Sequence, residues 1–356
     1  MTPSGSVGGV WGEAFQVERR GIDPLSGLAG AAASCAPLAL GIAAGEPEIG
    51  VVACFGGLNA ALAVPRGVLR KRLGWGFGAT LACSLSVALA TAVQGSVAAS
   101  VAVAFTWIGL AAILRTFGPS GGLTAFVTGA IFVIANGIPA ESLDVGTRVV
   151  WFLLGSLAGV VLMAAAYTRN APPPRPVATP LATALVRGAR ALRHAIVADA
   201  LLRAHALRLA STVAATTLLY QLLELQHGYW VPLTVLFVLR PSYGETLERI
   251  AMRAAGTVLG LLIATPLAEL IGGADLLEAL AIVLAAALSY SLLAIEYALF
   301  TAAITAFAVI YAHAFGQPAL AAADERAVAT AIGLVICALA FAVFHDRPEQ
   351  RDPAPA

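Results

Sequence analysis

The sequence predicts an all-α polytopic membrane protein of about twelve transmembrane helices, arranged as two six-helix repeats in parallel orientation. Three observations predict this fold. Apolar residues make up 59% of the 356 residues and charged residues only 12%, well below the share that is usual in soluble domains. Long uncharged windows recur along the chain, and several short patterns occur twice. The mean hydropathy of +0.86 excludes both a water-soluble globule and a disordered chain.

The uncharged windows give the positions of the expected spans. A helix that crosses a bilayer requires roughly 20 mostly apolar residues. The window 73–114 is long enough for two helices that turn near Gln94–Gly95, so each half of the chain supplies six spans. The windows free of Asp, Glu, Lys and Arg are residues 24–45, 49–65, 73–114, 116–140, 149–168, 209–223, 225–239, 254–268, 279–295, 297–323 and 327–345.

The positions of the basic residues predict the orientation. Cytoplasmic loops of membrane proteins are enriched in Lys and Arg. If alternate loops are cytoplasmic, that side collects every basic residue except Arg148 and Arg326, while the opposite side collects acidic residues. An odd number of spans would destroy this asymmetry. Both termini are therefore expected in the cytoplasm, and the protein is expected in the plasma (inner) membrane.

The linker between the halves differs from the spans in composition. It starts with the proline-rich stretch TRNAPPPRPVATP and continues as an amphipathic helix over residues 181–206, with Arg187, Arg190 and His194 on one face. Such a helix is expected to lie on the cytoplasmic membrane surface against anionic lipid headgroups. The expected segments are a cytoplasmic tail (1–24), the first repeat (25–168), the linker (169–204), the second repeat (205–345) and a second tail (346–356).

Three patterns indicate an internal duplication. The stretch 71–78, KRLGWGFG, aligns with 253–260, RAAGTVLG, as a basic residue followed by glycine three and seven positions later. Because an even number of helices per repeat gives both copies the same orientation, the repeat axis is expected along the membrane normal. The other matched pairs, 177 or 178 residues apart, are Thr124 and Thr301, Thr128 and Thr305, Arg148 and Arg326, and Gly155 and Gly333.

The most distinctive stretch runs over residues 227–260. It begins with HGYW, which places aromatic rings with a polar edge at a membrane interface. Pro232 interrupts the backbone soon afterwards, and Arg240–Pro241 ends the span. Gly256 and Gly260 then allow another helix to approach closely.

These elements resemble the signature of the fusaric acid resistance family of membrane proteins, which includes bacterial exporters of aromatic carboxylic acids. The resemblance is clear over residues 205–345, and the first half resembles the family only as a diverged copy. It implies transport of organic acids, with plant malate channels as distant relatives. The family's aspartate position on the last helix is Ala329 here, so a role for that carboxylate is absent or moved. The matching elements are His227–Trp230, Leu239–Pro241, Arg253–Gly260, Tyr297, Thr301, Arg326, Thr330 and Gly333.

Arg148 and Arg326 are the first candidates for contact with an anionic substrate. They occupy equivalent places on the acidic outer side, and a guanidinium offers two parallel donors to a carboxylate. The alternative is that they form ion pairs at helix starts, Arg148 with Asp144 and Arg326 with Asp324 or Glu325. The sequence leaves both interpretations open.

The remaining candidates fall into two groups. Those expected to contact the substrate, besides the two arginines, are Arg240, Arg253, Tyr229, Trp230, Thr301 and Thr305. Candidates for proton coupling are His227, Glu296 and Glu269. The alternatives are membrane-surface anchors for Arg240 and Arg253, a local hydrogen bond to Glu224 for His227, and a helix cap for Glu296.

The sequence indicates neither a cofactor nor enzyme chemistry. The single lysine, Lys71, does not follow glycine, so the chain has no P-loop. Its four cysteines lack metal-ligand spacing and are expected as small apolar packing residues. No metal site, catalytic residues or nucleic-acid partner are expected, and a homo-oligomer is compatible with the sequence.

The leading hypothesis is a secondary transporter that exports small organic, in particular aromatic, acid anions. The proton gradient or the membrane potential would drive it. Two alternatives are an organic-anion channel and a membrane component of envelope assembly that transports nothing.

Overall fold

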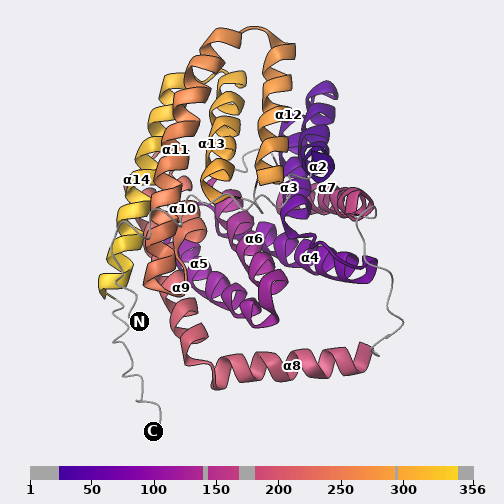
Figure 1. The fold of residues 1–356 in the computed structure, drawn as a ribbon, viewed down its shortest axis with the longest axis vertical. Helices are drawn as coiled ribbons and strands as arrows, with labels where there is room; N and C mark the ends of the chain where they lie inside the picture. The colour runs from indigo at the N-terminus through magenta and orange to yellow at the C-terminus, as the bar shows by residue number, and fades with distance from the viewer. Residues whose placement is uncertain (1–23, 139–142, 168–180, 293–295, 344–356) are drawn as a thin grey trace, which may run out of the picture.

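The computed structural model describes residues 24–138, 143–167, 181–292 and 296–343, and nearly all of these are helical (Figure 1). No strand occurs among them, so the predicted all-α fold is confirmed. The helices of the first half are α2 (Pro24–Ala43), α3 (Pro47–Ala63), α4 (Leu69–Val93), α5 (Val97–Ile113), the 3₁₀ turn η1 (Leu114–Phe117), α6 (Gly118–Gly137) and α7 (Val145–Ala166). They are followed by α8 (Leu181–Val197), α9 (Ala200–Leu222), α10 (Trp230–Val238), α11 (Tyr243–Ile271), α12 (Asp275–Leu292), α13 (Tyr297–Ala314) and α14 (Ala319–Val343).

A helix lies in every uncharged window, and the described helices have the composition of a multi-pass membrane protein. The segments α3 and α12 are apolar but shorter than a full span. The count of twelve spans therefore stays a prediction, as do the two terminal tails and the proline-rich linker, which lie outside the described residues. In the part of the chain that the structure describes, seven helical segments are long and apolar enough to cross a membrane: Pro24–Ala43, Leu69–Val93, Val97–Gly137, Val145–Ala166, Tyr243–Ile271, Tyr297–Ala314 and Ala319–Val343.

Helix α10 departs most from its expected length. The window 225–239 is uncharged, yet only nine of its residues are helical. At 1.5 Å per residue they span about 14 Å, less than half of a bilayer core of about 30 Å. The backbone before α10 has positive φ at Glu224 and His227, and Leu239 is extended two residues before Pro241. A lack of charge thus does not ensure a helix.

The predicted amphipathic helix over residues 181–206 is two helices. Helix α8 ends at Val197 and α9 starts at Ala200, because the side chain of Asp199 accepts a hydrogen bond from the amide of Leu202 at 2.9 Å and caps a new helix. The strongly amphipathic part is α8 alone, which lies across the lower end of the molecule in Figure 1. The next helix therefore begins at residue 200 rather than at residue 209.

The helices of the two halves pack in the same pattern. In the first half, α3 packs on α2 and α7, and α4 packs on α6 and α7. In the second half, α10 packs on α9 and α14, and α11 packs on α13 and α14. The most extensive contacts between the halves form two seams, one between α2 and α12 and one between α5 and α9. Each seam pairs the first helix of one half with the fourth helix of the other half. The contacts between the halves are therefore related by an approximate two-fold axis.

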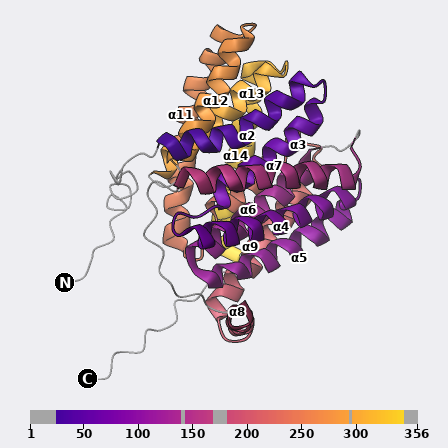
Figure 2. The same cartoon turned by 90° about the vertical axis from the view of Figure 1, so that its right-hand side faces the viewer.

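The two groups of helices do not share one direction. Helices α11, α13 and α14 run upright in Figure 1, whereas α2, α4, α5 and α7 run across Figure 2. The halves therefore cross steeply. The expectation that both repeats lie parallel about one membrane normal is not confirmed by this arrangement and stays a prediction.

The glycine patterns of α4 and α11 are not equivalent. A side chain at Gly256 or Gly260 of α11 would collide with Thr301 or Thr305 of α13, so these glycines bring the two helices into close contact. Gly74 and Gly78 of α4 face open space. The alignment of KRLGWGFG with RAAGTVLG is therefore wrong as a structural match.

Contacts between helices give the correct register. Cys83 of α4 lies 3.9 Å from the hydroxyl of Thr128 of α6, at the place where Gly260 packs on Thr305 in the second half. Both members of these pairs differ by 177 positions, which is also the offset of the matched threonines. This offset shifts the alignment of α4 with α11 by five residues. Arg253 then has Gly76 as its counterpart, and the first half has no equivalent basic group there.

The largest apolar core combines residues of both halves. It includes Phe132 of α6, Leu236 of α10 and Phe341 of α14, each nearly inaccessible to solvent. Helix α10 packs on α6, so the short helix lies where the two halves meet. Its side chains form the wall of the site described next.

Candidate functional site

Two arginines of the second half are buried without partners. Arg253 of α11 is 0% exposed and Arg326 of α14 is 2% exposed, and none of the side-chain nitrogens of either residue has a hydrogen-bond partner in the described part of the chain. The two guanidinium groups are close enough to repel one another electrostatically. Burying a charge without a partner is costly, so an arrangement of this kind is typical of a site that an anion completes.

Each of these guanidinium groups lies on an aromatic ring of α10. The carbon of the Arg326 guanidinium is 3.7 Å from the centre of the Trp230 ring, and that of Arg253 is 4.8 Å from the centre of the Phe237 ring. Trp230 and Phe237 are seven residues apart, which places them on the same face about two turns from each other. The rings stabilise the charges in part and leave the N–H donors available.

Threonine hydroxyls accompany the two arginines. The side-chain oxygens of four buried threonines have no hydrogen-bond partner in the described residues. Close packing of α11 on α13 at Gly256 and Gly260 brings two of them to the α11 surface. Together with the guanidinium donors they form a buried polar region that is rich in hydrogen-bond donors. The four are Thr257 of α11, Thr301 and Thr305 of α13, and Thr330 of α14.

A pocket of about 550 Å³, which we call the outer pocket, leads to Arg326 from the side that is expected to face outward. Trp230, Tyr229, His227 and Glu325 line it as well. Nδ1 of His227 lies 2.7 Å from Oε2 of Glu325, so Glu325 pairs with the histidine and not with Arg326. The expected local contact between His227 and Glu224 is thus replaced by a contact to α14. Tyr229 and Trp230 stack, with ring centres 5.2 Å apart.

A second pocket of about 670 Å³ lies on the side that is expected to be cytoplasmic. Arg115, Arg240, Arg249 and Tyr297 line it. The Arg249 guanidinium lies 4.1 Å from the centre of the Tyr297 ring. Burial, together with the charge of Arg249, lowers the pKa of Arg240 to about 10, so the group stays charged at neutral pH. We call this pocket, with its three arginines, the inner vestibule.

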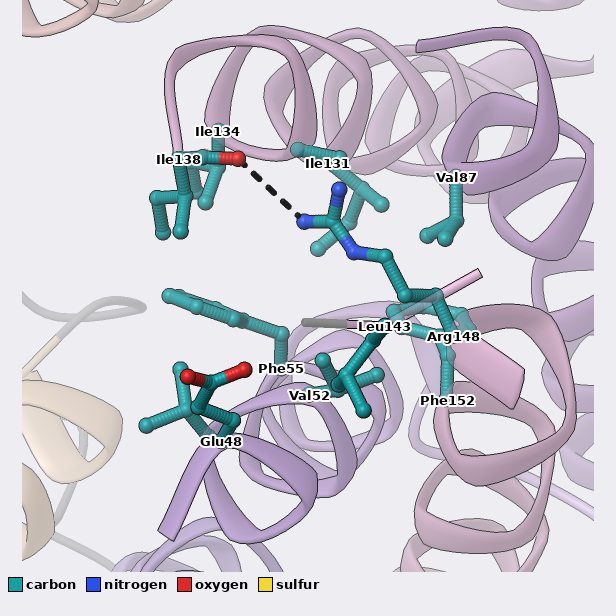
Figure 3. Close-up of a pocket in the computed structure, with 12 residues that line it drawn as sticks. Glu48, Val52, Phe55, Val87, Ile131, Ile134, Ile138, Leu143, Arg148 and Phe152 are labelled. Carbon is teal, nitrogen blue, oxygen red and sulfur yellow. Dashed lines mark hydrogen bonds between the residues drawn. The ribbon is translucent and has the colours of Figure 1, made fainter. Parts of the chain in front are cut away.

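Arg148 lies in a separate cavity of about 230 Å³ in the first half. Its guanidinium donates to Thr91 Oγ1 at 3.1 Å, to Gln94 Oε1 at 3.3 Å and to the carbonyl of Ile138 at 3.5 Å. Figure 3 shows it reaching between apolar side chains, with Glu48 on the other side of the cavity from Ile131 and Ile134. A role of Arg148 in substrate binding stays a prediction.

The ion pairs that the sequence left open as the alternative for Arg148 and Arg326 do not form among the described residues. Asp144 caps α7 by accepting hydrogen bonds from the amides of Gly146 at 2.8 Å and Thr147 at 3.1 Å. Arg148 therefore takes its partners from α4 and from a backbone carbonyl. No acidic side chain in the described part of the chain pairs with Arg326.

The three proton-coupling candidates lie apart. His227 lines the outer pocket. Glu296 accepts hydrogen bonds from the amides of Ala298 and Leu299 and caps α13, which is the alternative that the sequence left open. Glu269 of α11 is exposed and lines none of the described pockets. The coupling role of each stays a prediction.

Several residues of the site were not expected from the sequence. They include Thr257, Phe237, and Arg115 and Arg249 of the inner vestibule. Thr257 follows Gly256 directly in the distinctive stretch, so its position was a usable signal. Phe237 and the vestibule arginines have no local signal, because only the tertiary packing brings them to Arg253 and Arg240. No group of residues in the described ranges has the geometry of a metal site.

Comparison with known proteins identifies relatives of the second half. Residues 213–340 match the family described as "Fusaric acid resistance protein-like". An uncharacterized protein of Synechocystis is 37% identical over 139 residues, which is 38% of this chain and 18% of that protein. The inner membrane protein YccS of Escherichia coli is 30% identical over 153 residues, 43% of this chain and 20% of YccS.

The matches to these relatives thus span at most one fifth of the relatives' own length. An uncharacterized protein of Neisseria gonorrhoeae shares 48% identity over 59 residues, 17% of this chain and 14% of that protein. No solved structure matches the chain significantly. The resemblance to the fusaric acid resistance family is confirmed over residues 213–340.

Proposed function

Because residues 213–340 form a fusaric acid resistance protein-like region, we propose that this protein is a secondary transporter of the inner membrane that exports small organic acid anions, aromatic ones in particular. The observation that carries the proposal is the pair of buried, unpartnered guanidinium groups of Arg253 and Arg326. A carboxylate would supply the missing acceptor to either group. Charge-assisted bonds of this kind are strong in a desolvated site.

The proposed route follows α10. An anion collects in the inner vestibule at Arg240 and Arg249, passes Arg253 beside Phe237, and reaches Arg326 beside Trp230. From Arg326 it leaves through the outer pocket. The aromatic faces favour cargo that carries a flat apolar ring, and the threonine hydroxyls donate to the carboxylate between the two arginines.

The proposed membrane arrangement has twelve spans in two repeats with both termini cytoplasmic. Movement of one repeat against the other would expose the site alternately to each side. The membrane potential drives the export of an anion, since about 2.3 kcal/mol is available per charge per 100 mV. Of the candidates for proton coupling, His227 is the one placed in the outer pocket.

The test is transport in proteoliposomes. Purified protein is reconstituted, and uptake of radiolabelled hydroxybenzoate is followed under an imposed potential. We expect Arg326→Gln and Arg253→Gln to raise the half-saturating concentration about 10- to 100-fold, because each removes a charged donor worth about 1.5–3 kcal/mol. Arg187→Gln, which removes a positive charge from the exposed face of α8, is the matched control and retains transport.

The same preparation separates the alternatives. Wild-type uptake that responds to the potential supports the transporter, and resolved single-channel currents in planar bilayers would favour an anion channel instead. If the wild-type protein moves none of a panel of aromatic acids, the proposed function is wrong. If Arg326→Gln transports like the wild type, the assigned site is wrong.

A further inference from the structure

A small cavity of about 20 Å³ lies where α5, α6, α9 and α10 meet. Its polar wall consists of His205 of α9, Arg115 of η1 and Arg240, which follows α10. Apolar side chains, among them Ile108 and Leu236, form the rest. No acidic residue of the described ranges lines the cavity.

His205 has no hydrogen-bond partner. The residue is 1% exposed, and neither Nδ1 nor Nε2 contacts a donor or acceptor in the described residues. An imidazole carries at least one N–H at any pH, so a buried donor is left without an acceptor. Such groups are rare in folded proteins because they cost free energy, and they indicate a bound water or ion.

The charges around His205 are positive. Arg115, Arg208 and Arg240 all act electrostatically on it. Arg208 is held in place by donating to the carbonyl of Pro241 at 2.6 Å, beside Arg240. Glu245, in the first turn of α11, attracts Arg115 and Arg240 but does not line the cavity. The cavity therefore favours a negative occupant over a neutral one.

We propose that this cavity binds one small inorganic monoanion, which in cells is chloride. Its volume fits a single particle of about the size of water and is far too small for an organic acid. The ion accepts the N–H of His205 and lies between the charges of Arg115 and Arg240. It thereby ties α9, η1 and the end of α10 together. The inference does not depend on the proposed transport.

The test is the thermal stability of the purified, detergent-solubilised protein. Melting is measured while sodium gluconate is replaced by sodium chloride or bromide at constant ionic strength. A ligand that binds the folded protein alone stabilises it by mass action. We expect a saturable rise of the melting temperature in both halides and none in gluconate. Equal melting temperatures in all three salts would mean that the cavity holds water, and the proposal would fail.

A pair of variants locates the ion. His205→Leu is expected to abolish the halide-dependent shift, while His194→Leu, which removes an exposed histidine from α8, retains it. A shift that persists in His205→Leu would place the ion elsewhere and overturn the proposal. If His205→Leu does not fold, crystals of the wild type grown in bromide decide by anomalous scattering. A peak beside His205 supports the site, and its absence rejects it.

Discussion

Arg148 and Arg326 occupy corresponding positions in the two halves but have opposite surroundings. Arg148 donates to a threonine, a glutamine and a backbone carbonyl. Arg326 lies on the face of the Trp230 ring and has no hydrogen-bond acceptor among the described residues. The glycine contacts near the two arginines remain equivalent. Gly155 packs on Ala53 in the first half, and Gly333 packs on Val231 in the second half. Each residue of the second pair lies 178 positions after its counterpart in the first pair. Similar helix packing thus holds an arginine with hydrogen-bond acceptors in the first half and an arginine without them, among the described residues, in the second half.

This difference shows that the position of a cation does not determine its role. Thr91 of α4 and Gln94, the residue directly after this helix, make Arg148 part of the packing between α4 and α7. In the second half α11 supplies Arg253 near Arg326, a second positive charge. Of these two corresponding arginines, the one in the second half is therefore left without an acceptor among the described residues.

The largest expected effect comes from replacing each arginine by methionine. Arg326→Met removes an unpaired buried charge and is expected to stabilise the folded protein by about 1–4 kcal/mol while abolishing anion binding. Arg148→Met leaves buried acceptors without donors and is expected to destabilise it by about 1–3 kcal/mol. Thermal melting in detergent measures both. If Arg326→Met destabilised the protein as much as Arg148→Met does, the two arginines would have similar surroundings and the comparison would fail.

A carboxylate placed near Arg326 should make it resemble Arg148. Ala329 lies three residues further along α14 and is buried on the same face. We expect Ala329→Asp to pair with Arg326 and to raise the half-saturating concentration of a transported anion about tenfold, whereas Ala329→Asn has a smaller effect. Transport kinetics of the two variants in proteoliposomes measure this. Identical kinetics would mean that residue 329 does not reach the anion.

The glycines of α4 and α11 provide a comparison of packing. Gly256→Ala collides with Thr301 and is expected to cost about 1–3 kcal/mol, because α11 must move away from α13. Gly78→Ala enters open space and is expected to stabilise α4 by about 0.5–1 kcal/mol. Melting temperatures of both variants test the difference. A loss of stability for Gly78→Ala would contradict the register derived above.

The smallest expected effect concerns the cap of α7. The hydrogen bonds from Thr147 hold the pKa of Asp144 below its ordinary value. A carboxylate with a lowered pKa in the folded state contributes stability above the pKa of the unfolded chain, about 3.9, and loses it as the pH falls through the folded value. Asp144→Asn should therefore reduce the decline of the melting temperature below pH 4. If the melting temperature of Asp144→Asn fell with pH as steeply as that of the wild type, the Asp144 carboxylate would not contribute to stability in this way.

The sequence predicted the fold class and the positions of the helices because apolar runs are local. It did not predict the length of α10, since the positive φ of His227 and the extended Leu239 depend on backbone geometry that a count of charges cannot detect. It also missed the start of α9, where the single side chain of Asp199 begins a new helix.

The candidate site was predicted in part. The sequence singled out five of its residues: Arg253, Arg326, Trp230, Thr301 and Thr305. In the structure each of the two arginines lies over an aromatic ring, and the two threonines lie at the close contact between α11 and α13. Whether an arginine has a partner depends on residues far away in the chain. Thr91 lies 57 positions before Arg148, so the sequence alone could not separate the two arginines.

The two seams restrict how the halves can move. At one seam a side chain on Gly27 of α2 would collide with Ser291 of α12, and at the other Gly109 of α5 lies against Ala210 of α9. A hinge that opened one seam would strain the other, because each half is held at both. The small residues at these two points permit sliding instead. Any rearrangement of the protein is therefore expected to proceed as shear along α2 and α5, with the halves remaining in contact throughout.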